Sequence, residues 1–183
     1  MTIWLTSDQH FNHNRDFIYE PKGFKSVDEA TEISIARWNK VVKPNDTVYC
    51  LGDLALSGDL EKITSIIKRL NGTIILIRGN HDNDTRVELY KSLGIKVYER
   101  FYNLKFGGRT FHLEHYDNPR NYNSTDIFVH GHTHSPHKFC DKPNLYNVAV
   151  NAHNSYPVSI DTVLNEVQMQ EEQKRIKAAN REF

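Results

Sequence analysis

Histidine, carboxylate and amide side chains follow several apolar stretches of this 183-residue chain. Each stretch is typical of a β-strand, and the polar residues after it are of the types that bind metal ions or transfer protons. In open α/β sheets, ligands bind just beyond the carboxyl ends of the strands, so these residues predict one shared site. Five strand ends contribute: Ile3–Ser7 leads into Asp8 and His10, Val48–Leu51 into Asp53, Ile74–Arg78 into Asn80, His81 and Asp82, Phe111–Glu114 into His115, and Ile127–His130 into His132 and His134.

The spacing within two of these motifs indicates which side chains act together. Asp8 and His10 are two residues apart, and so are His132 and His134. In an extended chain, residues with this spacing point to the same side. We therefore expect each pair to face the site from an extended strand end.

The predicted donor set is larger than one metal ion needs. Two ions about 4 Å apart that share a bridging carboxylate would use every member. Nitrogen and oxygen donors without thiolate suit Mn, Fe, Zn, Ni or Co, among which the sequence does not choose. The set consists of Asp8, His10, Asp53, Asn80, His115, His132 and His134.

Taken singly, each motif has an ordinary structural interpretation. Gly-Asp is a common turn, and the Asp8-x-His10 motif alone is more often a solvated strand end. A Gly-Asn-His-Asp loop can simply connect a strand to a helix with a capping Asp. The joint pattern favours a metal site, because unrelated strand ends have no reason to fall in this order.

The remaining pattern predicts the elements that must hold the site. Helices are expected from Val27 to about Lys40 after a capping box at Ser26, from Asp59 to Asn71-Gly72, from Asn83 to Leu93, and from Thr162 onward. Strands are expected at Thr2–Thr6, Thr47–Leu51, Thr73–Ile77, Phe101–Phe106, Arg109–Glu114, Asp126–Val129 and Tyr146–Val150. Because strands and helices alternate only in the first half, we expect an α/β domain whose sheet is extended or doubled by a β-rich second half.

Gly107-Gly108 separates two of these strands and predicts a two-residue hairpin turn. Counting along the second strand of the hairpin, His115 shares a face with Leu113, whereas His112 points the other way. His115 is therefore a site candidate and His112 is not.

Composition and charge exclude several classes of protein. The 23 acidic residues balance the 23 basic ones, which gives no reason to expect bulk attraction to nucleic acid or membranes, although a local basic patch remains open. The apolar N-terminal stretch is too short for a signal peptide or a membrane span. Two cysteines, Cys50 and Cys140, are too few for a disulfide framework. We expect one cytoplasmic domain over residues 1–183, with residues 177–183 as a frayed tail; no oligomeric state is indicated.

The ordered motifs resemble those of the calcineurin-like metallophosphoesterases. All five lie in order over roughly residues 5–134, and the tail, with Asn147–Val150 and Tyr156–Ser159, is similar as well. The resemblance implies an α/β fold in which two mixed β-sheets and flanking helices form a four-layer sandwich. Three strings are similar to the small bacterial and phage-type members: Thr6-Ser-Asp-Gln-His-Phe11, Ile77-Arg-Gly-Asn-His-Asp82 and His130-Gly-His-Thr-His134.

The resemblance also implies a role for each site residue. His81 matches the catalytic histidine of the family, which stabilises the transition state or protonates the leaving oxygen. Arg78 and Asp82 would support the loop that carries His81. A metal-bridging hydroxide would attack the phosphorus atom. The first metal would be held by Asp8, His10, Asp53 and His134, and the second by Asp53, Asn80, His115 and His132, with Asp53 bridging the two.

The loop from Tyr116 to Thr125 starts beside His115 and is the expected substrate loop. It is rich in tyrosine and asparagine, and a merely solvated loop is the alternative. Glu114 stands where the family often has a small residue, and Asn151 where many members have Asp. Candidate substrate contacts are His13, Tyr116, Arg120 and Tyr122, with Arg120 gripping a phosphate.

We therefore expect a dinuclear, metal-dependent phosphoric ester hydrolase with Mn²⁺ as the favoured ion. A phosphodiester is the favoured substrate, small or nucleotide-derived and including a cyclic nucleotide, because a chain this short has little room for a cap domain. The nearest alternative is a phosphomonoesterase or nucleotidase, followed by a nuclease. The alternative of another class is a non-catalytic metal-binding scaffold. The presence of His81 and of all seven candidate ligands counts against it.

Overall fold

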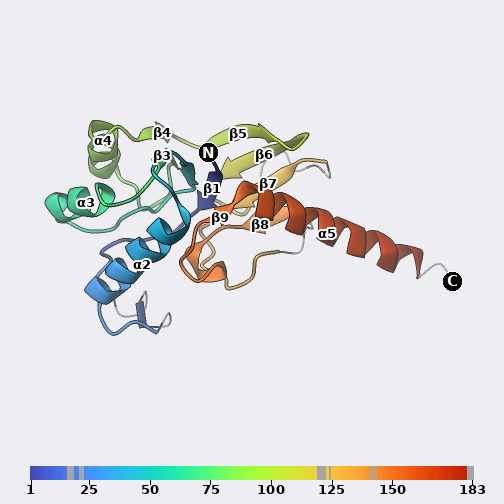
Figure 1. Ribbon diagram of the computed structural model, residues 1–183, viewed down its shortest axis with the longest axis horizontal. Coiled ribbons are helices and arrows are strands. Elements are labelled where there is room, and N and C mark those ends of the chain that lie inside the picture. Colours follow the sequence, from blue (N-terminus) through green and yellow to red (C-terminus); the bar gives the residue numbers. More distant parts are fainter. Residues whose placement is uncertain are drawn as a thin grey trace.

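Two β-sheets form the centre of the computed structural model, which describes residues 1–15, 19–20, 23–118, 123, 125–140, 142 and 144–180 (Figure 1). The first sheet has five strands in the order β4-β3-β2-β1-β9. Strands β1 to β4 are parallel, and only β9 runs antiparallel to its neighbour. The strands are β1 (Ile3–Thr6), β2 (Thr47–Cys50), β3 (Thr73–Ile77), β4 (Lys96–Tyr98) and β9 (Val158–Ser159).

The second sheet has four strands in the order β5-β6-β7-β8. Strands β6, β7 and β8 are parallel, and β5 pairs with β6 as an antiparallel hairpin. The hairpin turns at Gly107 and Gly108, whose φ angles of 55° and 74° are both positive, as a tight two-residue turn requires. The strands are β5 (Phe101–Phe106), β6 (Arg109–Glu114), β7 (Ile127–His130) and β8 (Leu145–Asn147).

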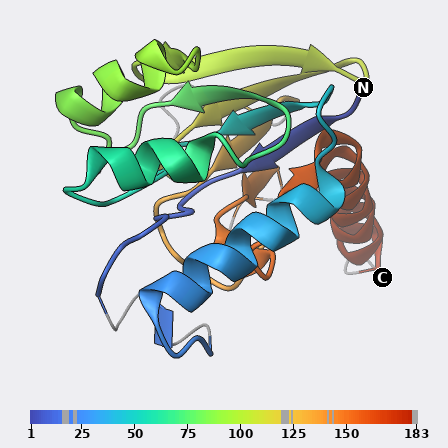
Figure 2. The same ribbon diagram turned by 60° about the vertical axis from the view of Figure 1, so that its left-hand side comes forward.

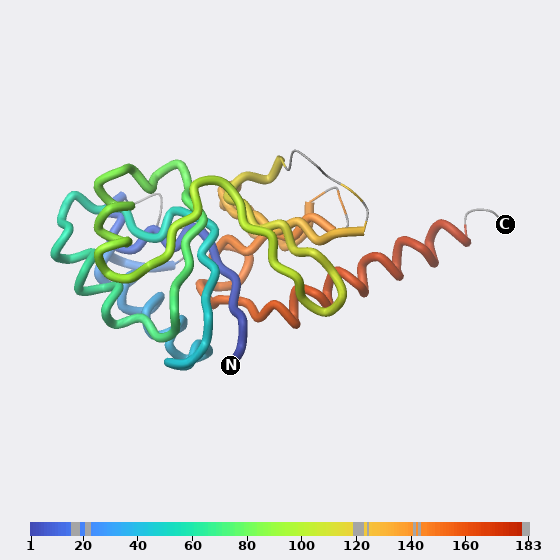
Figure 3. Tube along the Cα trace, turned by 90° about the horizontal axis from the view of Figure 1, so that it is seen from above, coloured from blue at the N-terminus to red at the C-terminus, as the bar shows by residue number. Residues whose placement is uncertain are grey.

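Helices α2 to α5 each begin after a residue whose side chain accepts a hydrogen bond from a backbone N–H in the first turn. Helices α2 to α4 lie over one face of the first sheet, whereas α5 packs by its first half and its second half projects away from the rest of the molecule (Figures 2 and 3). The helices and their caps are α2 (Val27–Val41, Ser26), α3 (Leu60–Ile67, Asp59), α4 (Asp84–Ser92, Asn83) and α5 (Ile160–Ala179, Ser159); a short 3₁₀ helix, η2, covers Val150–Ala152.

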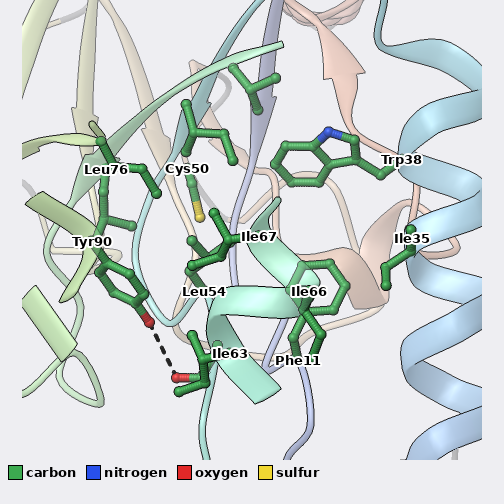
Figure 4. Close-up of a cluster of buried hydrophobic side chains, with 14 of the residues drawn as sticks. Phe11, Ile35, Trp38, Cys50, Leu54, Ile63, Ile66, Ile67, Leu76 and Tyr90 are labelled. Atoms are coloured by element: carbon green, nitrogen blue, oxygen red, sulfur yellow. Dashed lines mark hydrogen bonds between the residues drawn. The ribbon is translucent and has the colours of Figure 1, made fainter. Parts of the chain in front are cut away.

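Alternate residues of the first sheet face two different hydrophobic clusters. On one face, Cys50 and Leu76 pack against Trp38 of α2, the isoleucines of α3 and Tyr90 of α4 (Figure 4). On the other face, Leu5 and its neighbours pack against the second sheet and the first half of α5. Burial on both faces explains why β1, β2 and β3 are continuous apolar runs. Each fully buried aliphatic side chain contributes about 1.5–3 kcal/mol to folding.

The carboxyl ends of the parallel strands from both sheets lie next to one another. Beyond β1, the N–H of Asp8 donates to the carbonyl of Gly52, and beyond β7, the N–H of Gly131 donates to the carbonyl of His115. A bridge between Ser7 and Ala149 joins the two sheets at this edge. The fold therefore brings all five predicted strand ends together.

The architecture is the predicted one, two mixed sheets flanked by helices, but some elements differ from expectation. Strands β4 and β9 have three and two residues and were not predicted, because so short a stretch carries little periodicity. The strand expected at Tyr146–Val150 is β8, which begins and ends earlier. Helix α5 includes residues 177–179, and residues 181–183 lie outside the described part of the chain. Within the described residues, no helix combines the length and apolar character that crossing a bilayer requires.

Candidate metal centre

Carboxylate and imidazole atoms converge at this edge in two groups that share Asp8. The first group is Asp8, His10 and His134, and the second is Asp8, Asp53 and His115; within each group the ligand atoms lie within 4.8 Å of one another. The Oδ1 atom of Asp8 is 3.9 Å from the Nε2 atom of His10 and 3.7 Å from that of His134. The Oδ2 atom of Asp53 is 3.6 Å from Nε2 of His10 and 3.7 Å from Nε2 of His115.

These separations fit donors arranged around cations. They are too long for hydrogen bonds. Two donors that each lie about 2.1 Å from one ion in tetrahedral geometry are roughly 3.4 Å apart. The Oδ1 atom of Asp8 is buried and accepts no hydrogen bond from any described residue. A buried carboxylate oxygen in this state is costly unless a positive charge satisfies it, so the donor set fits a metal ion.

Asn80 and His132 complete the predicted donor set on the side of His115. The Oδ1 atom of Asn80 lies 2.8 Å from Nε2 of His115 and 3.0 Å from Nδ1 of His132. The opposite ring nitrogen of His115, Nδ1, donates to the carbonyl of Leu51 at 2.7 Å, because a carbonyl oxygen only accepts. A neutral His115 therefore turns the lone pair of Nε2 toward Asn80, and a cation would satisfy both acceptors.

The backbone at the site differs from the extended strand ends that we expected. Five of the seven predicted ligands have left-handed φ angles, between 48° and 67°: Asp8, His10, Asp53, His132 and His134. The extended-chain interpretation of the paired spacings is therefore wrong. Instead, His132 lies beside Asn80 while His134 lies beside Asp8, so one motif serves both groups. Such conformations cost about 1–3 kcal/mol each and concentrate at functional sites.

Two glycines of the motifs, Gly52 and Gly131, allow the loops to approach this closely. A Cβ atom on Gly52 would lie 2.6 Å from Nδ1 of His115, and one on Gly131 would lie 2.5 Å from Cβ of Ser7. Gly52 also has a φ of 93°, which side chains other than hydrogen rarely permit. Larger residues at these positions would push the ligand loops apart.

Asp82 and Arg78 contact the backbone of the loops that carry Asp53, Asn80 and His81. The buried Oδ2 atom of Asp82 accepts hydrogen bonds from the N–H groups of Asp53 and Gly79, at 2.8 and 2.9 Å. Arg78 donates from Nε to the carbonyl of Asp82 at 2.7 Å. Burial raises the pKa of Asp53, against the opposing influence of His115 and of the N–H of His81. A bound cation would stabilise the ionised carboxylate of Asp53 and so oppose the effect of burial on its pKa.

The other predicted residues surround the cluster. The ring of the exposed His81 stands edge-on to His10, with ring centroids 5.4 Å apart, and the His13 ring lies 5.5 Å from that of His10. Tyr116 is 48% exposed, and the centroid of its ring lies 5.0 Å from that of His115 and 4.9 Å from that of His132. The predicted contacts Arg120 and Tyr122 lie outside the described residues.

Two residues show what the sequence predicted correctly and what it missed. His112 points away from the site, as predicted, and bonds to Asp126 at 2.8 Å while stacking on Phe128. Sequence reasoning missed Arg86, whose guanidinium donates to the carbonyl of His81. Its position three residues after Asn83, the N-cap of α4, places it in the first turn, but the path of the His81 loop is not visible in the sequence.

Known proteins share this sequence and fold. An uncharacterized protein of Methanocaldococcus jannaschii is 36% identical over 169 residues, which cover 88% of this chain and 89% of the relative. The gene 66 protein of Mycobacterium phage L5 is 28% identical over 162 residues, covering 73% of this chain and 77% of its own length. The crystal structure of a protein of unknown function from Aquifex aeolicus has a TM-score of 0.72 at 25% identity, over 90% of this chain and 98% of that one.

The model of the calcineurin-like phosphoesterase family matches residues 1–176. This range contains both donor groups, His81 and every strand of the two sheets. The chain therefore belongs to the calcineurin-like phosphoesterases, a family of metal-dependent hydrolases that act on phosphoesters.

Proposed function

We propose that the protein hydrolyses a phosphodiester with the help of two divalent metal ions. The observation that carries the proposal is the pair of donor groups that share Asp8, which lie on strand ends from both sheets. One ion would leave donors unused, since six described side chains with carboxylate or imidazole groups converge there along with the amide of Asn80. Mn²⁺ is our first choice, and Fe, Zn, Ni and Co suit the same nitrogen and oxygen donors.

Asp53 is the carboxylate that we propose to be shared between the ions. Its Oδ2 atom lies between His10 and His115, at 3.6 and 3.7 Å from their Nε2 atoms. When bound, divalent cations supply positive charge that neutralises a phosphoryl group and lowers the pKa of water. The proposed ligands are Asp8, His10, Asp53 and His134 for the first ion, and Asp53, Asn80, His115 and His132 for the second.

His81 is the residue that we propose to act on the leaving group. Its imidazole is exposed beside His10, and no described residue hydrogen-bonds to the ring. A ring nitrogen is therefore available to hold a proton and donate it to the departing oxygen. We also propose that Tyr116, whose exposed ring lies beside His132, contacts an ester group of the substrate. His13, Arg120 and Tyr122 remain proposed substrate contacts.

The charges around the donors support a diester over a monoester. A phosphate monoester dianion carries one more negative charge than a diester, and arginine is the side chain best suited to bind its oxygens. Among the described residues, no lysine or arginine takes part in the ion pairs of the predicted ligands. On this basis we favour a singly charged phosphoryl group, including that of a nucleotide-derived diester, and the proposed phosphate contact Arg120 lies outside the described residues.

The test is hydrolysis of bis(p-nitrophenyl) phosphate beside p-nitrophenyl phosphate, on protein stripped with a chelator and then supplied with Mn²⁺. We expect turnover only with metal, and a higher kcat/KM for the diester. A higher kcat/KM for the monoester would replace our proposal with a phosphomonoesterase. Absence of turnover with each of the five metals, for a protein that binds them, would favour a non-catalytic scaffold.

A His81→Ala variant tests the chemical role separately from metal binding. General acid catalysis contributes roughly 10²–10⁴-fold, so we expect a loss of kcat in that range with unchanged metal content. His137→Ala is the matched control, because His137 is an exposed histidine outside both donor groups. Equal activity of the two variants would remove His81 from the mechanism.

A further inference from the structure

Arg86, in the first turn of α4, grips the backbone of His81. Its Nε atom donates to the carbonyl oxygen of His81 at 3.0 Å, and its Nη2 atom donates to the same oxygen. We propose that Arg86 is a positioning residue that fixes His81 for its action on the leaving group. The inference rests on the proposed role of His81 in phosphodiester hydrolysis.

The imidazole of His81 depends on its backbone for its position. The ring is exposed, forms no hydrogen bond with any described residue, and touches His10 only edge-on. The peptide groups on both sides of the residue are held instead. Its N–H donates to Oδ1 of Asp53 at 2.9 Å, and its carbonyl accepts from Arg86 and from the N–H of Asn83, the latter at 3.1 Å. The N–H of His81 is thus held by Asp53, a proposed metal ligand, and its carbonyl is held by residues at the start of α4.

Helix α4 is a rigid support for this contact. The backbone N–H of Arg86 donates to Oδ1 of Asn83, the N-cap of the helix, at 3.0 Å. Val87 and Tyr90 bury the inner face of the helix, and the Tyr90 hydroxyl donates to the carbonyl of Ala55 across the core (Figure 4). The Arg86 residue is therefore held at its backbone by a capped helix and at its guanidinium by the carbonyl of His81.

Arginine suits this position because its planar group presents two donors to one carbonyl oxygen. A lysine offers a single point of contact on a flexible stem, so it would restrict the loop less. Without the guanidinium, the bond from Asn83 is the only one that the described residues still donate to the carbonyl of His81, and the loop gains freedom to rotate. A displacement of about 1 Å of a catalytic group can cost on the order of 100-fold in rate.

The experiment compares Arg86→Ala and Arg86→Lys with wild type on aryl phosphodiesters whose leaving groups have increasing pKa values. For Arg86→Ala we expect kcat to fall roughly 10- to 100-fold, with little change in KM or metal content. The loss should grow as the leaving group becomes more basic, because such groups need the proton most. Arg86→Lys should recover part of the rate. Arg69→Ala is the control, since Arg69 is a largely exposed arginine that pairs with Glu32 far from the site.

A double variant shows whether Arg86 acts through His81. In a His81→Ala background, removal of Arg86 should have almost no further effect on kcat. In metal-free protein, Arg86→Ala should broaden the imidazole NMR signals of His81, and Arg69→Ala should not. Equal losses in both backgrounds, equal losses for all leaving groups, or loss of bound metal would overturn the inference.

The failure of this inference is distinguishable from the failure of the proposed function. If wild type is active and His81→Ala is impaired while Arg86→Ala retains full activity, only the role of Arg86 is overturned. If wild type hydrolyses no phosphoester with any metal, the proposed function fails, and with it the role of Arg86.

Discussion

Gly79 lies against Asp53 so closely that a Cβ atom on Gly79 would be 2.8 Å from the backbone nitrogen of Asp53. Its φ angle is not in the left-handed region, so the requirement for glycine is one of space. The contact holds the loop after β3 against the loop after β2, where the proposed shared ligand lies.

Gly79→Ala should therefore displace Asp53 and weaken metal binding. Forcing a methyl group into a packed site costs about 1–3 kcal/mol of unfolding free energy. Thermal unfolding and a metal count by mass spectrometry check both effects. Gly58→Ala is the matched control, because nothing lies within 4 Å of a Cβ atom there. Normal metal content in Gly79→Ala would contradict the close-approach argument.

Asp53→Asn should change the stability of the metal-free protein little and should reduce its stabilisation by Mn²⁺ strongly. Burial raises the pKa of Asp53, so the ionised carboxylate is disfavoured in metal-free protein and its removal should cost little stability. Wild type should gain about 2.7 kcal/mol at a Mn²⁺ concentration 100 times its Kd. The variant should gain much less. Melting curves with Mn²⁺ and with a chelator measure this, and Asp59→Asn, which keeps a helix cap on α3, should respond like wild type.

Asp46 should make stability depend on pH in the acid range. Its carboxylate accepts from the N–H of Thr2 at 2.7 Å, from the N–H of Lys43 at 3.0 Å and from the indole of Trp4 at 3.0 Å. These bonds, led by that from Thr2, lower the pKa of Asp46 to about 2 from an ordinary 3.8. The folded pKa is the lower one, so the contribution is complete above pH 3.8 and is lost as the pH falls toward 2.

Asp46→Asn should accordingly be less stable than wild type at neutral pH and should show a flatter pH dependence between pH 4 and pH 2. Urea unfolding at several pH values measures both. Asp161→Asn, at an exposed position in the first turn of α5, is the control. Parallel curves for wild type and Asp46→Asn in this range would contradict the prediction.

Tyr116→Ala should impair the hydrolysis of esters with flat aromatic groups. Stacking of a base on an aromatic side chain contributes about 1–3 kcal/mol, so kcat/KM should fall roughly 5- to 150-fold. Tyr116→Phe should retain most activity, and metal content should not change in either variant. Steady-state kinetics with aryl and alkyl diesters is the measurement. Phe101→Ala, which removes an exposed aromatic side chain on β5, is the control, and an equal loss for both ester types would exclude stacking.

Local signals in the sequence were enough to predict several helix starts and the hairpin turn. Ser26 and Asp59 cap their helices as predicted, and the hairpin turns at Gly107 and Gly108. These features depend on residues a few positions apart, whose hydrogen bonds and φ preferences are intrinsic. Strand β9 is different: it exists because Ser159 pairs with Trp4, a partner that its own sequence does not indicate.

The types of the site residues could be predicted, but their backbone conformations could not. Asp8 adopts a φ of 59° while its N–H donates to the carbonyl of Gly52, a contact between distant parts of the chain. An asparagine or aspartate tolerates this conformation, yet only the tertiary contact selects it. The same holds for Arg86, whose acceptor is a backbone carbonyl and so leaves no trace in side-chain patterns.

The backbone N–H of His132 donates to Oδ2 of Asp8 at 2.9 Å, and the two residues are 124 positions apart in the sequence. Asp8 follows the first strand of one sheet, and His132 follows a strand of the other. A ribosome adds about 5–20 residues per second. Asp8 is therefore made several seconds before His132 and His134. The proposed donor set is therefore incomplete until His134 has been synthesised, although Asp8 is among the first residues made.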